Sequence, residues 1–414
     1  MKLTLSQNAK NAIKLGTLCS ISYFAVYIAR NVLSPVTNQM LNEGFNEAYF
    51  GLISSVFLLS YACGQLINGF IGHKIPAKFM LFIGLLGAGC TYIIFPFIAH
   101  NKIGSMFTYG ITGFFLSMIY SPMVKLVAEN TEPIHAVRCS LGYTFASLLG
   151  SPTASLLAAF LTWQSVFLTS SGALICMAII ALIFFVRFEK KGVIKPKSQT
   201  HVVRTEKSGF KMLVKRGIIK FSFISILTGI IRTSVVFWIP TYLAQQLNFS
   251  ASSAAKINTA VMLAISSSSF IAIFMYERLK RNINASMLIS FITSSIFFAL
   301  TLVVKVPVAN IIFLTLAILS GECSSSLMWS VYCPSLRDTG MTSIATGYLD
   351  FLSYSAAALS SIIFGNAVTH IGWNPLIAIW LALMIIGIIV SLPYKYIFKR
   401  QNKNNTTIET TTEN

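Results

Sequence analysis

Residues Ser165–Phe188 read SVFLTSSGALICMAIIALIFFVRF, and no charged side chain interrupts them before Arg187. About 20 apolar residues are enough for a helix to cross the hydrocarbon core of a membrane. Similar stretches recur along all 414 residues, and only 10% of the chain is charged, whereas soluble domains carry about 25% charged residues. The composition therefore excludes a soluble enzyme, a disordered regulator and a secreted disulfide scaffold. It predicts a polytopic, all-α membrane protein.

Charges and clusters of Pro, Asn and Gly divide the chain into twelve predicted spans in two six-helix halves. The N-terminal half covers residues 1–188 and the C-terminal half covers 221–398, with a basic polar stretch, 189–220, between them. A polar tail, 399–414, is rich in Asn and Thr and is expected to be disordered. The predicted spans are Leu15–Asn38, Ala48–Gly72, Lys78–Ala99, Ile103–Leu126, Cys139–Leu161 and Ser165–Phe188, then Phe221–Gln245, Ala254–Tyr276, Ala285–Val304, Val308–Cys333, Thr342–Val368 and Trp373–Tyr396.

The lysines and arginines are distributed very unevenly around these spans. Two of the 31, Arg30 and Arg232, fall inside predicted helices; of the other 29, 26 lie on the side of the termini and 3 (Lys102, Lys256 and Lys305) on the opposite side. Because cytoplasmic loops carry an excess of Lys and Arg, both termini, the tail and the central stretch are predicted to be cytoplasmic, in a multi-pass protein of the inner or plasma membrane. The net charge of +19 then reflects topology and attraction to membrane lipid, and no nucleic acid partner is expected.

Residues that could support catalysis or metal binding do not cluster. The seven cysteines lie mostly inside apolar segments without CxxC spacing, so we interpret them as small buried side chains. There is no nucleophile–base pair, no metal-ligand cluster and no nucleotide-binding glycine loop. We therefore expect neither an enzyme, nor a cofactor, nor transport driven by ATP on this chain. The cysteines are Cys19, Cys63, Cys90, Cys139, Cys176, Cys323 and Cys333.

The two halves carry an internal repeat. Arg30 and Arg232 lie 202 positions apart, in predicted helices 1 and 7, and His73 and Glu277 lie 204 positions apart, after helices 2 and 8. Twelve helices in two repeats, related by an axis along the membrane normal, resemble the major facilitator architecture. The segment Gly69–Lys74 resembles the loop motif of that superfamily, G-x-x-x-D-R-x-G-R-K, with His73 in place of the acid.

Four ionisable residues are predicted within the membrane: Arg30, Arg232, Glu322 and Asp350. An arginine at mid-bilayer costs about 3 kcal/mol on insertion scales, and such residues usually face an internal cavity. One interpretation is two structural ion pairs, since the four charges cancel. The other is that the two arginines, on symmetry-related helices, converge on a substrate.

The neighbours of Arg30 favour a substrate site. Tyr23 and Tyr27 precede Arg30 by seven and three positions, so all three share a helical face. In predicted helix 2, Tyr61 and Gln65 form a similar polar pair. A guanidinium fork binds phosphate or carboxylate with two hydrogen bonds, and two arginines without neighbouring acids match a dianion. Because phosphate monoesters are the commonest small dianions near neutral pH, the residues indicate a carrier of phosphorylated anions.

Four motifs resemble the organophosphate:phosphate antiporters, which include bacterial glycerol-3-phosphate and hexose-6-phosphate transporters. The run from Tyr27 to Pro35 (YIARNVLSP) resembles their helix 1, and the run from Tyr61 to Gly69 (YACGQLING) resembles helix 2. Arg232 followed by Trp238–Leu243 (WIPTYL) resembles helix 7, and Gly347–Tyr354 (GYLDFLSY) resembles helix 11. The resemblance implies a major facilitator fold and a protein, functional as a monomer, that exchanges an organic phosphate for inorganic phosphate. The substrate-binding residues that it implies, with the candidates added from helices 2 and 11, are Arg30, Arg232, Tyr23, Tyr27, Tyr61, Gln65, Asp350 and Tyr354.

Two departures from the family concern the organic part of the substrate. The glycerol-3-phosphate carriers have a lysine where Gln65 stands, and a histidine in helix 5. Predicted helix 5 has none, and His135 is expected in the loop before it. Asp350 either contacts a polar part of the substrate, tunes Arg232, or pairs with a Ser or Thr in helix packing. A transporter-like sensor of sugar phosphates and a facilitator of other anions, such as carboxylates or nitrate, remain alternatives.

Overall fold

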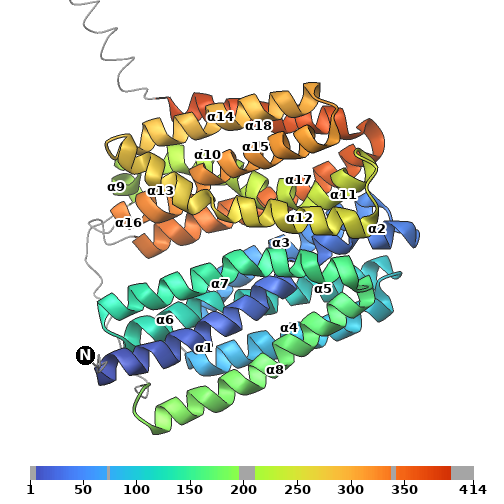
Figure 1. The fold of residues 1–414 in the computed structure, drawn as a ribbon. Coiled ribbons are helices and arrows are strands. Elements are labelled where there is room, and N and C mark those ends of the chain that lie inside the picture. The colour runs from blue at the N-terminus through green and yellow to red at the C-terminus, as the bar shows by residue number, and fades with distance from the viewer. Residues whose placement is uncertain (1–5, 72–74, 195–209, 337–341, 393–414) are drawn as a thin grey trace, which may run out of the picture.

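The computed structural model describes residues 6–71, 75–194, 210–336 and 342–392, which are built of helices (Figure 1). The helices of the N-terminal half are α1 (Gln7–Arg30), α2 (Leu33–Asn42), α3 (Glu47–Ile71), α4 (Ala77–Ile98), α5 (Lys102–Ser117), α6 (Tyr120–Asn130), α7 (Pro133–Phe160) and α8 (Trp163–Lys190). Those of the C-terminal half are α9 (Phe210–Lys215), α10 (Ile218–Gly229), the π-helical η1 (Ile230–Val235), α11 (Val236–Gln245), α12 (Ala251–Ser266), α13 (Ser268–Arg278), α14 (Ile283–Val303), α15 (Pro307–Leu327), the π-helical η2 (Met328–Tyr332), α16 (Cys333–Ser335), α17 (Thr342–Ile371) and α18 (Trp373–Ser391).

The predicted membrane fold of twelve spans in two six-helix halves is confirmed. Within the described ranges, eleven helical stretches are long and apolar enough to cross a membrane, and α7, with its apolar part Phe145–Phe160, makes the twelfth. Several spans consist of two or three consecutive elements, such as α1 with α2 and α10 with η1 and α11. The predicted tail 399–414, the second half of the Gly69–Lys74 motif (72–74) and the centre of the 189–220 stretch lie outside the described residues.

Two details of the predicted helices are wrong. Helix α7 begins at Pro133, so His135 lies in its first turn and not in a preceding loop. Proline is favourable there because the first residues of a helix have no intrahelical use for an N–H. The cysteines are also not uniformly buried: Cys63, Cys90 and Cys176 are exposed on the outside of their helices, whereas the other four are buried. Exposure of a small apolar side chain suits a surface that faces lipid.

The helix that carries Arg30 is interrupted directly after that residue. The sequence predicts one helix, Leu15–Asn38, but α1 ends at Arg30 and α2 begins at Leu33. Pro35 has no N–H to bond the carbonyl of Asn31, four residues earlier, which explains the break. The Asn31 side chain donates a hydrogen bond to the Tyr27 carbonyl, at 2.7 Å, and so caps the end of α1.

The helix that carries Arg232 is also irregular. The π-helical η1 spans Ile230–Val235 and contains the arginine, and Pro240 follows inside α11. Single π-helical turns inside α-helices are frequent at functional sites, because they redirect a side chain relative to its neighbours. Both arginines therefore lie where the regular helix is disturbed.

The two halves contact each other at the end of the bundle formed by α2 and α11. Figure 1 shows these two helices side by side, whereas the ribbons of the halves diverge toward the end that holds the N-terminus and α9. Asn38 Nδ2 donates to the Pro240 carbonyl at 2.6 Å, and Asn258 Nδ2 donates to Ser155 Oγ at 2.7 Å. Neutral hydrogen bonds thus join the halves at this end, and Gln245 also donates to the Glu47 carboxylate across the interface.

Helices α3 and α17 approach each other with their backbones at the same end. A Cβ atom placed on Gly365 would lie 3.1 Å from Gly51 Cα and 2.9 Å from the carbonyl oxygen of Glu47. Such distances leave no room for a larger side chain, so the two glycines permit the close contact. Farther along, the rings of Tyr61 and Tyr354 meet at 5.0 Å between centroids.

Candidate functional site

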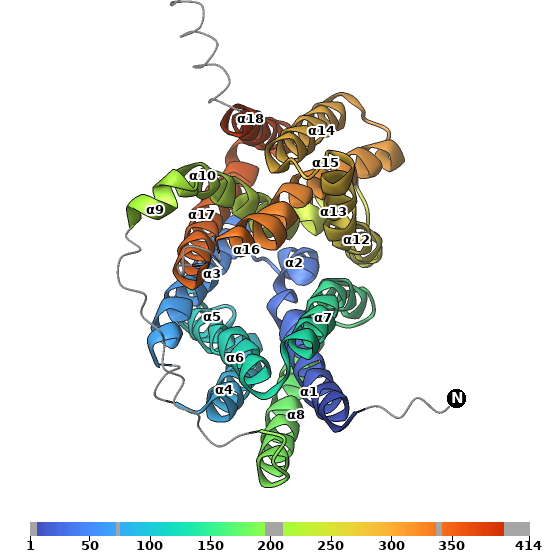
Figure 2. The same cartoon turned by 90° about the vertical axis from the view of Figure 1, so that its left-hand side faces the viewer.

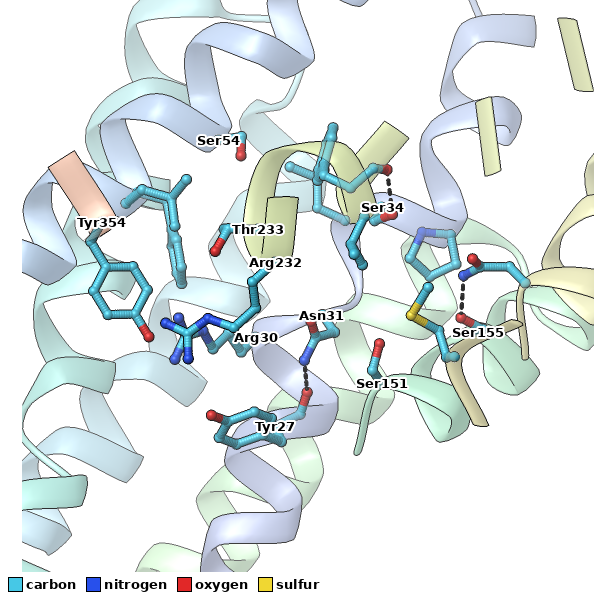
Figure 3. A pocket seen from close by; sticks show the side chains of 18 of the residues that line it. Tyr27, Arg30, Asn31, Ser34, Ser54, Ser151, Ser155, Arg232, Thr233 and Tyr354 are labelled. Carbon is cyan, nitrogen blue, oxygen red and sulfur yellow. Dashed lines mark hydrogen bonds between the residues drawn. The ribbon is translucent and has the colours of Figure 1, made fainter. Parts of the chain in front are cut away.

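A pocket of about 140 Å³ lies between the halves, just inside the end at which they touch (Figure 3). It is smaller than the roughly 300–1,000 Å³ of pockets for drug-sized ligands. Its polar wall comes from both halves and includes Tyr27, Arg30, Asn31, Ser34, Ser54, Tyr109, Ser151 and Ser155 from the first half and Arg232, Thr233, Asn258 and Tyr354 from the second.

Arg30 is held by aromatic rings. Its guanidinium carbon lies 4.5 Å from the ring centroid of Tyr61, 4.9 Å from that of Tyr354 and 5.6 Å from that of Tyr27. A cation over an aromatic face is stabilised by about 2 kcal/mol or more when the pair is desolvated. The rings therefore hold the guanidinium in place at the wall of the pocket.

Arg232 enters the pocket from the other half. Its guanidinium carbon lies 5.5 Å from the centroid of the Tyr354 ring and 6.0 Å from that of Trp329. Its Nη2 atom is buried and has no hydrogen-bond partner within the described structure. A buried charged donor without a partner is costly, which marks this nitrogen as a position for a ligand that accepts hydrogen bonds.

The two arginines share one aromatic neighbour. Both guanidinium groups lie over the Tyr354 ring, and Figure 3 shows them close together at the same side of the pocket. Two cations this near to each other repel in a medium of low dielectric constant. An anion placed between them would relieve that repulsion and accept hydrogen bonds from both halves at once.

The buried carboxylates do not form contact ion pairs with the arginines. In the part of the chain that the structure describes, no carboxylate oxygen lies within 4.0 Å of either guanidinium. The charges of Glu322 and Asp350 do act on Arg232 at longer range, and Asp350 also interacts with Arg30. One oxygen of Glu322, a buried residue of α15, has no hydrogen-bond partner there. The acids thus modulate the field around the pocket without occupying the arginine donors.

The predicted residues fall into two groups. Tyr27, Arg30, Arg232 and Tyr354 line the pocket, and Tyr61 is stacked against Arg30 at its edge. The others lie outside the lining. Tyr23 is buried behind Tyr27, with 4.9 Å between ring centroids, Gln65 is half-buried one helical turn beyond Tyr61, and Asp350 is half-buried one turn before Tyr354.

Most of the neutral polar lining was not predicted from the sequence. Asn31 and Ser34 belong to a quoted motif without an assigned role, and the other Ser, Thr and Asn residues of the lining are scattered over α3, α7, η1 and α12. A single hydroxyl in a membrane helix carries no specific signal, since it often bonds the carbonyl four residues earlier. The missed lining residues are Asn31, Ser34, Ser54, Tyr109, Ser151, Ser155, Thr233 and Asn258.

The chemistry of the pocket is that of anion binding. Its walls present two guanidinium groups, phenol and alcohol hydroxyls and amide groups, and the lining contains no carboxylate. In the described ranges of the chain, no group of three or more His, Cys, Asp or Glu residues could hold a metal ion. The guanidinium groups match the oxygens of a phosphate or a carboxylate.

Comparison with known families and folds gives consistent matches over most of the chain. The profile of the Major Facilitator Superfamily matches residues 19–361. Among solved structures, a D-xylose–proton symporter superposes with a TM-score of 0.71 at 12% identity, covering 93% of this chain and 97% of its own. A bacterial homologue of the human lysosomal transporter Spinster, in an inward-facing and occupied conformation, gives 0.70 at 12% identity, covering 94% of both chains.

Two curated proteins match a smaller part of this chain, and the names of both refer to phosphorylated compounds. The glycerol-3-phosphate transporter of Bacillus subtilis (strain 168) is 21% identical over 254 residues, which is 56% of this chain and 57% of that protein. The human voltage-gated purine nucleotide uniporter SLC17A9 is 24% identical over 156 residues, 36% of each chain. This chain therefore spans between about a third and somewhat over half of the length of these relatives.

Proposed function

Because this chain belongs to the Major Facilitator Superfamily and is a membrane transporter, we propose that it is an antiporter that exchanges an organic phosphate for inorganic phosphate. The organic phosphate would be a sugar phosphate, a glycerol phosphate or a related ester. The observation that carries this proposal is the pair of arginines, one from each half, over the same Tyr354 ring and without a contacting carboxylate among the described residues. The names of both curated relatives, which refer to glycerol 3-phosphate and purine nucleotides, support a phosphorylated anion.

The proposed mechanism follows from the placement of the arginines. A phosphate dianion between Arg30 and Arg232 links the two halves and cancels both charges. Rocking of the halves about that site then exposes it alternately to the two sides of the membrane. Without the anion, two desolvated cations oppose closure. The empty carrier should therefore reorient slowly, and exchange should be faster than net transport.

The test of the substrate class is counterflow into proteoliposomes loaded with inorganic phosphate. External glycerol 3-phosphate, hexose 6-phosphates and phosphoglycerate are each expected to drive phosphate exit, whereas citrate, nitrate and unphosphorylated glucose are not. Exit driven by the carboxylate or by nitrate alone would contradict the proposal. The panel also identifies the organic part of the substrate, for which Gln65 on α3 and Asp350 on α17, one turn from Tyr61 and Tyr354, are the proposed contacts.

We further propose that the N-terminus and α9 lie on the cytoplasmic side. The prediction uses two exposed residues at opposite ends of the bundle, Gln7 at the start of α1 and Lys305 between α14 and α15. In a background without natural cysteines, an impermeant maleimide added to intact cells should label Lys305→Cys but not Gln7→Cys, because positive loops stay inside. After permeabilisation both should react. Labelling of Gln7→Cys in intact cells would reverse the orientation.

Gln65 is expected to affect the organic part of the substrate more than the phosphate. It lies on α3 one turn beyond Tyr61 and outside the pocket lining, so Gln65→Ala should change the preference among phosphate esters several-fold and leave phosphate self-exchange near the wild-type rate. Gln39→Ala is the matched control, because Gln39 donates to the carbonyls of Ala158 and Leu161 and has a structural role. An equal loss for every substrate in Gln65→Ala would show that Gln65 also supports the fold.

A further inference from the structure

A second pocket lies on the outer surface of the N-terminal half, between α1 and α7. Figure 1 shows the two helices next to each other along the front of the bundle, and Figure 2 shows both at its periphery. The pocket has a volume of about 340 Å³. It is lined by Ala9, Ala12, Ile13, Gly16, Thr17, Ser20 and Ile21 of α1 and by His135, Arg138, Cys139 and Gly142 of α7.

Small residues make the floor of this pocket. Cys139 Sγ contacts the Ala12 carbonyl at 3.4 Å, and a Cβ on Gly16 would lie 2.6 Å from the same sulfur. A Cβ on Gly142 would lie 2.8 Å from Ser20 Oγ. The helices therefore pack closely through these residues. The larger side chains on either side of them form the walls of the pocket, which is a groove between the two helices.

The walls of the groove are apolar away from the end nearest the N-terminus. Ile13 and Ile21 are 53% and 51% exposed, and Phe145, one turn beyond Gly142, is 58% exposed. On α1, Ile21 lies on the side opposite Tyr23 and Arg30. The exposed residues at this end of the helix, which include Ile13, Thr17 and Ile21, share one side. The groove consequently faces outward and not toward the substrate pocket. Exposed large apolar side chains on a membrane helix are positioned to contact lipid chains.

The end of the groove nearest the N-terminus is basic. Arg138 is exposed and lines the pocket, and Lys10 and Lys14 are exposed in the first turns of α1, the helix that forms the other wall. The acid at this end, Glu132, accepts a hydrogen bond from Asn8 at 2.7 Å and lies 3.8 Å from His135. Arg138, Lys10 and Lys14 outnumber the one carboxylate, so this end of the groove, which we call its mouth, is positively charged.

We propose that this groove binds one anionic phospholipid of the cytoplasmic leaflet. The headgroup phosphate would be bound by Arg138 and by Lys10 or Lys14, and an acyl chain would lie over Gly16 and Gly142 between the apolar walls. Basic pockets between transmembrane helices at the cytoplasmic side suit anionic headgroups. The charge of the mouth and the apolar walls together require a ligand with a phosphate at one end and a hydrocarbon chain at the other, which a soluble phosphate ester lacks.

The bound lipid would also stabilise the α1–α7 pair. A chain in the groove extends the contact between these helices without needing larger residues at Gly16 and Gly142. Since α1 ends at Arg30, the lipid would hold the helix that carries one of the two arginines. This site is separate from the substrate pocket, so its test does not depend on transport.

The experiment measures lipid retention by the purified full-length protein. Detergent-solubilised wild type is mixed with equal amounts of phosphatidylglycerol and phosphatidylcholine and examined by native mass spectrometry. Wild type is expected to retain one phosphatidylglycerol at least 5-fold more than phosphatidylcholine. Arg138→Ala should reduce that preference to near unity, whereas the control Arg278→Ala, at the end of α13 in the other half, should retain it.

A second variant tests the groove and not the charge. Thr17 is exposed and lines the pocket, so Thr17→Trp should fill it and displace the lipid with the basic mouth intact. Thr169→Trp, on the exposed side of α8, is the matched control and should bind normally. Equal retention of both lipids by wild type, or unchanged retention in Arg138→Ala and Thr17→Trp, would overturn the proposal. A wild-type dimer that Thr17→Trp converts to a monomer would also overturn it, because a second copy would then occupy the groove.

Discussion

Arg30→Lys and Arg232→Lys are each expected to lower phosphate self-exchange in proteoliposomes by about 10- to 100-fold. A hydrogen bond to a charged group contributes about 1.5–3 kcal/mol, and about 1.4 kcal/mol corresponds to a factor of ten. Lysine keeps the charge but not the planar fork that binds two phosphate oxygens at once. Lysine also loses much of the stacking on the Tyr61 and Tyr354 rings that positions Arg30.

The matched control is Arg278→Lys, an arginine whose guanidinium carbon lies 5.1 Å from the Phe274 ring, on α13 and outside the site. It should exchange phosphate at the wild-type rate. Size-exclusion chromatography and thermal unfolding verify that each variant is folded. Near wild-type exchange in both Arg30→Lys and Arg232→Lys would mean that the arginines are structural. The proposed binding of phosphate between them would then be wrong.

A covalent link between the halves is expected to abolish exchange almost completely. Asn258 of α12 and Ser155 of α7 are joined by a hydrogen bond of 2.7 Å across the interface. In a background without natural cysteines, Ser155→Cys with Asn258→Cys should form a disulfide on oxidation and keep the halves together at this end. If transport requires the halves to separate there, oxidation should remove more than about nine-tenths of the exchange, and reduction should restore it.

A disulfide within one half provides the control. Ser269 and Ser326, on α13 and α15 of the C-terminal half, have their hydroxyl oxygens 3.1 Å apart. The corresponding double cysteine variant should also form a disulfide, verified by a gel shift, and should exchange phosphate equally well oxidised and reduced. Unimpaired exchange in the oxidised Ser155→Cys, Asn258→Cys variant would contradict rocking of the halves about the site.

The membrane fold was predictable because a bilayer imposes its own length on a helix. Runs of about 20 apolar residues can be counted without knowledge of their partners. The start of α7 at Pro133 was not predictable in this way. A membrane helix can extend past the hydrocarbon core into polar residues, so the first turn of α7, which contains His135, has no hydropathy signal. Pro133 alone does not decide the matter, because proline occurs both in loops and as the first residue of a helix.

The charged part of the candidate site stood out in the sequence, and its neutral part did not. An arginine in a transmembrane segment is expensive enough to be noticed at once. The contact of Tyr354 with both guanidinium groups depends on how α17 packs against α3 and η1, which no local pattern records. The break after Arg30 had a signal in Pro35, but the π-helical turn around Arg232 depends on tertiary packing.

The neutral contacts between the halves have a consequence for the response to ionic strength. Asn38 with Pro240, Ser155 with Asn258 and Gly51 with Gly365 join uncharged groups, and no cation–anion pair connects the halves within the described ranges. Mobile ions screen charged groups and leave buried neutral hydrogen bonds almost unchanged. The charged groups that cross the interface, Glu47 and Lys256, contact the neutral Gln245 and Phe160. Added salt therefore has no described ion pair to screen at this interface, while it competes directly for the two arginines. In such a carrier, the salt dependence of exchange reports on occupancy of the binding site and not on the movement of the halves.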